Sequence, residues 1–73
     1  MTQNEKVLRH LQEFGSITPL DALKEYSIMR LASRISDLKR MGYKITSEII
    51  TTKNKFEEPT HYSVYRLAEE KEN

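Results

Sequence analysis

The apolar residues of this 73-residue chain change their spacing at Gly42. Before this glycine they recur every three or four residues, which is the spacing of a helix face. After it, β-branched residues alternate with polar ones, as they do in strands. A chain of this length has room for one domain. The sequence therefore predicts a single α+β domain in which helices come first and strands follow.

Two helices are expected before residue 26. The first carries a helical stripe that begins at Val7 and ends at Phe14, and Gly15 provides a left-handed stop. The second spans about residues 19–25, where Thr18 can cap a helix that has Pro19 at its first position. On this second helix, Leu20, Leu23 and Ala22 are expected to face inward, and Asp21 can return a hydrogen bond to the cap.

A third helix is expected over residues 29–41, ended by Gly42. Its inward stripe consists of Ile28, Leu31, Ile35 and Leu38. A rotation of 100° per residue places the polar residues on the opposite face and Lys39 near the inward side. Strands follow at 43–52 and 60–67, joined by a polar loop, and the resulting two-stranded hairpin must pack on the helices to be stable. The domain then covers residues 1–67, and residues 68–73 form an acidic tail.

Positive charge is concentrated in the middle of the chain. The whole molecule has a formal net charge of only +1. Residues 24–44, however, hold six basic residues against Glu25 and Asp37, a net charge of +4; the six are Lys24, Arg30, Arg34, Lys39, Arg40 and Lys44. Charge gathered on one face can attract a polyanion even when the total is near zero. The alternative is an ordinary solvated helix face.

Several classes of function find no support in the residues. The chain has no cysteine, which excludes disulfides, thiol nucleophiles and cysteine-based zinc sites. His10 and His61 show no metal-ligand spacing, and no phosphate-binding glycine motif occurs. We therefore expect neither an enzyme nor a cofactor. Without a signal-peptide pattern or a long apolar run, the expected location is the cytoplasm, away from membranes.

The order of helix, short helix, tight turn, longer helix and hairpin is that of a winged helix-turn-helix. The segment from Ser16 to Leu23, together with the one from Ile28 to Ile45, resembles the small winged helix-turn-helix domains of phage and prophage proteins. The run from Arg30 to Leu38 is the more specific part of this resemblance. Two features depart from it: Ser27 stands where such turns often carry glycine, and Glu57 and Glu58 are acidic residues near the wing tip.

The resemblance implies binding to double-stranded DNA and regulation of phage or mobile-element genes, either as a transcription regulator or as an excision-type factor. In a helix-turn-helix the second helix enters the major groove, which here is the helix at 29–41. The expected DNA-contacting residues are Arg30, Ser33, Arg34, Ser36, Asp37, Arg40, Lys44, Lys53, Asn54 and Lys55. A single small module also suggests binding as a dimer or in tandem.

These candidates divide by chemistry. Arg30, in the first helical turn, can read guanine, whereas Arg40 and Lys44 suit phosphate. Arg34 either contacts DNA or pairs with an acidic neighbour, and Asp37 either accepts from cytosine or orients an arginine. The small hydroxyls Ser33 and Ser36 would let the helix approach the bases. The loop residues Lys53, Asn54 and Lys55 either reach DNA or only solubilise the loop. A different hypothesis is that the domain binds and inhibits a host protein.

Overall fold

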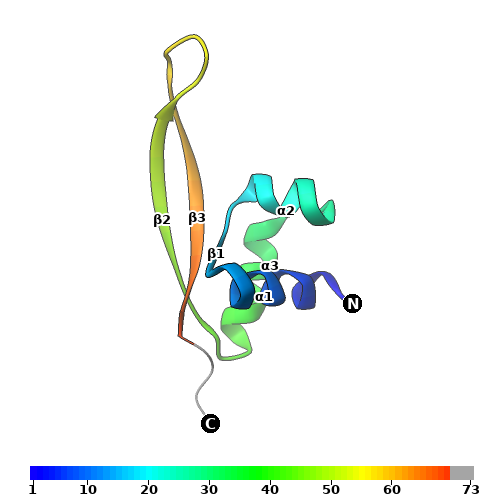
Figure 1. The fold of residues 1–73 in the computed structure, drawn as a ribbon. Helices are drawn as coiled ribbons and strands as arrows, with labels where there is room; N and C mark the ends of the chain where they lie inside the picture. The colour runs from blue at the N-terminus through cyan, green and yellow to red at the C-terminus, as the bar shows by residue number, and fades with distance from the viewer. Residues whose placement is uncertain (70–73) are drawn as a thin grey trace.

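Three helices precede a long hairpin in the computed structural model, which describes residues 1–69. In chain order the elements are α1 (Gln3–Phe14), β1 (Ser16–Ile17), α2 (Pro19–Tyr26), α3 (Leu31–Arg40), β2 (Lys44–Lys53) and β3 (Pro59–Glu69). The helices gather at one end of the hairpin, and the rest of the hairpin extends past them (Figure 1). The molecule is accordingly elongated, with extents of 47 × 22 × 20 Å. The predicted α+β class and the helix-then-hairpin order are confirmed.

The sheet has three antiparallel strands in the order β1-β3-β2, rather than the two that the sequence predicts. The added strand β1 places Ser16 opposite Arg66 and Ile17 opposite Tyr65. It exists because Gly15 ends α1 in the left-handed conformation, with a φ of 84°, and turns the chain alongside β3. Two residues are too few to show an alternating pattern, so the sequence carries no signal for this strand.

Side-chain caps define the first two helices. Thr2 caps α1, and Thr18 caps α2. In α2, the Asp21 backbone N–H donates to Thr18 Oγ1 at 3.1 Å, and the Thr18 backbone N–H donates to the Asp21 carboxylate at 3.1 Å. This reciprocal pair satisfies donors that a helix start otherwise leaves unpaired. The predicted cap and the proline at the first position are both present.

Replacing Thr18 with alanine should therefore lower the free energy of unfolding by about 1 kcal/mol. The substitution removes the side-chain acceptor of the cap while leaving the α2 sequence unchanged. Urea unfolding followed by circular dichroism measures it. Thr52→Ala, at an exposed position of β2, is the control and should change stability by less than about 0.5 kcal/mol. Equal effects of the two substitutions would contradict the capping role.

The core lies where the three helices meet the base of the sheet. It contains Val7, Leu11, Ile17, Ala22, Ile28, Leu31, Ile35, Leu38 and Ile45. Tyr65 and Leu67 of β3 pack against it from the face that they share with Ile45. The expected stripe of α3 is confirmed. Three other apolar residues expected to face inward, namely Phe14, Leu20 and Leu23, are exposed instead.

The exposure of Leu20 and Leu23 follows from the length of α2. A helix of eight residues buries one narrow face, and here that face is centred on Ala22, which is fully buried. Leu20 and Leu23 lie to one side of it. Phe14, at the end of α1, is exposed and meets the ring of His10 at its surface, with a centroid distance of 4.7 Å. Spacing alone marked these positions as helical but could not fix which side meets the neighbouring elements.

A polar pair lies at the edge of this core. His10 is buried, and its Nδ1 lies 2.7 Å from the Tyr26 hydroxyl. Burial raises the pKa of Tyr26, and the nearby carboxylate of Glu25 adds to the effect. A raised folded-state pKa means that the neutral phenol is favoured in the fold. The stabilisation that comes from the raised pKa of Tyr26 is fully present when the pH is below the ordinary pKa of tyrosine. It is lost as the pH rises through the folded-state pKa of Tyr26.

The turn between α2 and α3 is built around Ser27 in the left-handed conformation, with φ 58° and ψ 31°. The Ser27 N–H donates to Leu23 O and the Ile28 N–H donates to Ala22 O, both at 3.0 Å, which closes α2 as a glycine-ended helix would be closed. The chain then passes through Met29 and Arg30 before α3 begins. The predicted helix over 29–41 is therefore too long at both ends.

The hairpin pairs β2 with β3 from Lys53 opposite Pro59 down to Lys44 opposite Glu69. A register shift between Lys44 and Ile45 marks an irregularity at its base. β3 continues two residues beyond the predicted end of the second strand, through Ala68 and Glu69. The remaining residues of the predicted acidic tail, 70–73, lie outside the described part of the chain.

Candidate nucleic-acid interface

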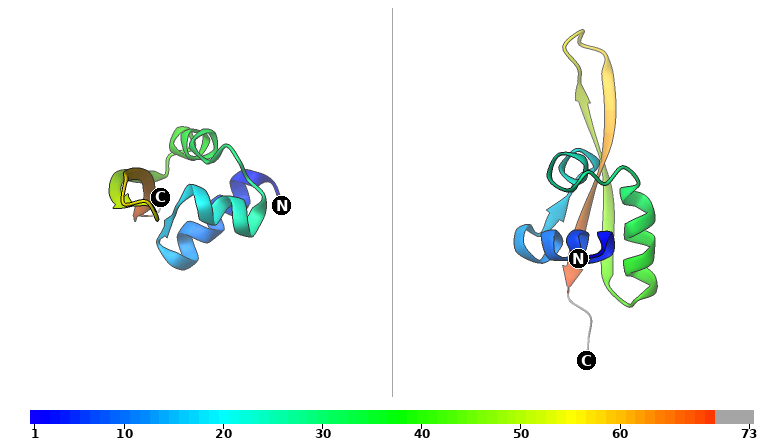
Figure 2. Two further views of the ribbon diagram at one scale, coloured as in Figure 1. Left: turned by 90° about the horizontal axis from the view of Figure 1, so that it is seen from above. Right: turned by 90° about the vertical axis from the view of Figure 1, so that its right-hand side faces the viewer.

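The exposed side of α3 is a narrow polar strip. Leu31, Ile35 and Leu38 are buried beneath the helix, whereas Ala32, Ser36, Lys39 and Arg40 are exposed. Seen from above, α3 lies on one side of the molecule, with α1 and α2 on the other (Figure 2). The strip is thus open to a large partner, and it combines two small residues with two cationic ones. Such a surface can approach a groove closely and also meet phosphates.

The start of α3 differs from the starts of the other two helices. Arg30 occupies the N-cap position with φ −115° and ψ 60°, and its side chain makes no capping hydrogen bond. The first turn of α3 contains no acidic residue, whereas those of α1 and α2 contain Glu5 and Asp21. The positive end of the α3 dipole is therefore not offset by a carboxylate there, and exposed Arg30 adds to it.

Asp37 joins the arginines of α3 to α1. Its carboxylate lies 3.3 Å from Arg34 Nη2 and 2.8 Å from Arg40 Nη2. It also accepts a hydrogen bond from the Asn4 side chain of α1 at 3.3 Å. The Arg34 side chain is 31% exposed and that of Arg40 is 78% exposed, so the two arginines that pair with Asp37 differ strongly in their access to solvent. Asp37 thus fixes Arg34 within the fold and leaves Arg40 largely in solvent.

Ser33 lies on the same side of α3 as Asp37 and is only partly exposed. Ser36 is exposed on the strip. Lys44 follows α3 at the start of β2 and is also exposed. Of the seven candidates between Arg30 and Lys44, the structure therefore brings Ser36 and Arg40 together on the open strip, and it turns Ser33, Arg34 and Asp37 toward the α1 side.

The three wing candidates lie far from α3, at the end of the hairpin (Figure 1). Lys53 and Lys55 are exposed there. The Asn54 side chain holds the turn: its carbonyl oxygen accepts from the Phe56 N–H at 2.8 Å and the Glu58 N–H at 3.1 Å. Lys55 Nζ lies 5.3 Å from the centroid of the Phe56 ring. The tip is therefore an ordered turn with two cations, and its Asn54 amide is already engaged.

Lys39 was not among the expected contacts, yet it lies on the open strip. Its angular position, close to the apolar stripe, suggested a place near the inward side. The structure shows otherwise because α1 covers the flank of α3 that carries Arg34 and Asp37, which leaves the flank with Ala32 and Lys39 open. The information needed was the packing direction of α1, which a helical wheel of α3 does not contain.

The open strip carries exposed cations and a hydroxyl group. Within residues 1–69, no three acidic or histidine side chains gather in a way that could hold a metal ion. No helix in the same range is long and apolar enough to cross a membrane. The polar strip offers cations, hydroxyls and an open helix start, all of which are hydrogen-bond donors to phosphate or base edges.

Comparison with known proteins agrees with this description. No match to the chain was found among the curated proteins or among the solved structures. A family described as a winged helix-turn-helix domain matches residues 2–70. The match covers α1 through β3, the helix pair α2–α3 and the hairpin included. On its sequence and its fold together, the chain belongs to the winged helix-turn-helix family.

Proposed function

We propose that this protein binds double-stranded DNA sequence-specifically, with α3 in the major groove and the hairpin as an auxiliary contact. The observation that carries the proposal is the open side of α3, where Ser36, Lys39 and Arg40 are exposed and the helix start beside Arg30 has no acidic residue. In a helix-turn-helix this is the surface that enters the groove. The role we attach to it is regulation of phage or mobile-element genes or of their recombination.

In this arrangement the candidates have different tasks. Arg30 reads a base edge or an adjacent phosphate from the start of α3, and Ser36 allows close approach. Lys39, Arg40 and Lys44 meet the phosphates. Asp37 keeps Arg34 and Arg40 in place, so we assign Arg34 a supporting role together with Ser33. The wing contacts a flanking phosphate or the minor groove through Lys53, Asn54 and Lys55. Asn54 also shapes the turn that presents the two lysines.

Selection of bound duplexes from a random DNA pool tests sequence specificity. We expect a defined motif, and two motifs at fixed spacing if the protein binds as a dimer or in tandem. A pool that remains random after several rounds, although DNA is retained, would reduce the proposal to non-specific binding. Failure to retain any DNA would overturn it.

Arg30→Ala is the sharper test once a selected site exists. We expect it to weaken binding to that site by about 1–3 kcal/mol and to relax base preference at one position. Gel shifts against the selected and a scrambled duplex measure both effects. Arg9→Ala on α1, where Arg9 pairs with Glu13 at 3.3 Å, is the matched control and should leave binding unchanged. Equal losses on both duplexes would make Arg30 a phosphate contact only.

A second candidate function is binding and inhibition of a host protein. It is favoured by the partial neutralisation of α3, since one carboxylate pairs with both Arg34 and Arg40. A DNA-binding helix normally keeps its cations available. Pull-down from host extract, run beside the gel shift, separates the two candidates: an identified host factor that loses activity, with no retained duplex, would favour this one.

A further inference from the structure

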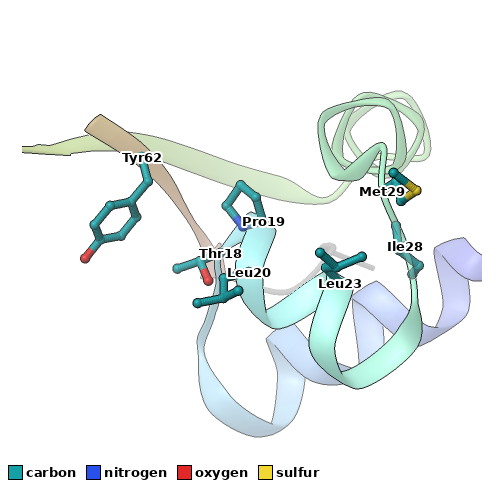
Figure 3. Close-up of a pocket in the computed structure, with 7 residues that line it drawn as sticks. All are labelled: Thr18, Pro19, Leu20, Leu23, Ile28, Met29 and Tyr62. Carbon is teal, nitrogen blue, oxygen red and sulfur yellow. The ribbon is translucent and has the colours of Figure 1, made fainter. Parts of the chain in front are cut away.

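An apolar groove separates α2 from the outer part of β3. Its volume is about 670 Å³, and it is lined by Thr18, Pro19, Leu20, Leu23, Ile28, Met29 and Tyr62. Leu20, Leu23 and Met29 are 63%, 47% and 84% exposed. Among residues 1–69, none of the side chains that line it is charged. Figure 3 shows Leu20 and Leu23 projecting from α2 between Tyr62 on one side and Met29 on the other. Small proteins seldom expose so many large apolar side chains together without a partner.

The edge of β3 at this groove has no neighbouring strand within residues 1–69. β1 pairs with β3 only at Tyr65 and Arg66, and the chain then leaves at Thr18 to begin α2. The Leu67 N–H donates to Gly15 O at 3.2 Å, so backbone groups of Leu67 point to the β1 edge. Because alternate residues point to the same edge of a strand, those of Ser63 and His61 do so as well. They extend past the end of β1.

Basic residues flank the groove at the α2 end. Lys24 is exposed and lies one helical turn after Leu20, on the same side of α2. Arg30 is exposed and directly follows Met29. The acidic Glu25 lies about 200° around the helix from Leu23, and so on the far side of α2. A segment that enters the groove is therefore favoured if it is apolar inside the groove and acidic where it passes Lys24 and Arg30.

We propose that this groove binds an extended segment of another protein, which adds to the free edge of β3 as a further strand in line with β1. Backbone groups of the segment pair with Ser63 and His61, alternate apolar side chains enter the groove, and an acidic residue lies near Lys24 and Arg30. This is strand addition, in which the backbone supplies affinity and the side-chain pockets supply specificity. The groove lies between α2 and β3 and shares no lining residue with the open strip of α3, although Arg30, which flanks the groove, is also a proposed DNA contact.

The test uses a synthetic probe and the full chain. The probe is a peptide in which valine alternates with threonine over seven residues, followed by two glutamates. Titration followed by nuclear magnetic resonance should shift the amide signals of His61 and Ser63 and the methyl signals of Leu20 and Leu23. At saturation, amide exchange at His61 and Ser63 should slow by roughly tenfold or more. No shift at these positions up to about 1 mM peptide would overturn the proposal.

Matched peptides distinguish strand addition from non-specific hydrophobic binding. Proline in place of the central valine removes a backbone donor and should weaken binding by roughly tenfold. Lysines in place of the two glutamates should weaken it severalfold, because Lys24 and Arg30 are basic. If all three peptides bind equally, strand addition is excluded.

Protein variants complete the test. Leu23→Glu should abolish peptide binding. Met29→Glu should do the same, and it serves as a second variant because Met29 is more exposed than Leu23 and its replacement is less able to disturb the fold. Glu25→Gln, on the far side of α2, should bind the peptide as the wild type does. Leu23→Glu should retain DNA binding, so failure here and failure of the proposed function are distinguishable. A self-association of the free chain that Leu23→Glu disrupts would show that a second copy fills the groove, and would overturn the proposal.

Discussion

Leu38→Ala should leave much of this protein unfolded at room temperature. Leu38 is 1% exposed and lies in α3 among Leu31, Ile35 and the first helix. Truncation removes its transfer free energy and leaves a cavity, at a cost of about 2–5 kcal/mol. A domain of this size buries a smaller share of its surface than a larger one, and its total stability is of the same order, about 5 kcal/mol.

Urea unfolding measures this loss as a lower midpoint with an unchanged slope. Ser36→Ala lies two residues earlier on the exposed strip of the same helix and is the matched control. It keeps the helix sequence otherwise intact, and its effect should stay within about 0.5 kcal/mol. A loss below about 1 kcal/mol for Leu38→Ala would show that α3 is not held by its aliphatic side, and the assignment of its open face would fall with it.

Removing both cations from the open strip should cost most of the affinity for DNA. Lys39→Gln combined with Arg40→Gln removes the two side chains that we propose as phosphate contacts while leaving the buried side of α3 unchanged. Each contact contributes about 0.9 to the slope of log affinity against log salt, so the slope should fall in magnitude by about 2. At about 0.15 M salt this corresponds to a loss on the order of 30-fold in affinity.

The control is a double variant with the same change in net charge at other places. Arg9→Gln with Arg66→Gln removes two cations that lie outside the α3 strip and are ion-paired, with Glu13 at 3.3 Å and with Glu48 at 3.1 Å, as Arg40 is with Asp37 at 2.8 Å. Its salt slope should match the wild type. Fluorescence anisotropy over a salt series, with melting curves for all three proteins, measures both quantities. If the two double variants lose the same affinity, total charge rather than the α3 strip governs binding.

The sequence was sufficient for the fold wherever the signal was local. The Thr18 cap with Pro19, the left-handed Gly15 and the change of period at Gly42 each depend on a few neighbouring residues, and each marks a real boundary in the structure. Boundaries set by long-range contacts were missed. β1 is a strand because β3, far along the chain, runs beside it.

The same distinction applies to the candidate site. Which residues belong to α3 could be predicted within two positions, and so could its buried stripe. Which flank of α3 stays open could not, because that is decided by α1 through Asn4 and Asp37. For the same reason the helical spacing predicts an inward Lys39 and core positions for Leu20 and Leu23, whereas all three are exposed. A periodic pattern defines the angle of each side chain around its own helix but not the position of the neighbouring helix.

The reach of the hairpin has a mechanical consequence. From Thr51 to Pro59 every residue is exposed, so this outer part is stabilised by its own cross-strand pairs and by the Asn54 turn, without support from the helices. Its shape can therefore change at little cost to the interior. If the hairpin contacts DNA as we propose, this arm can follow a curved or widened duplex without disturbing the packing of the helices.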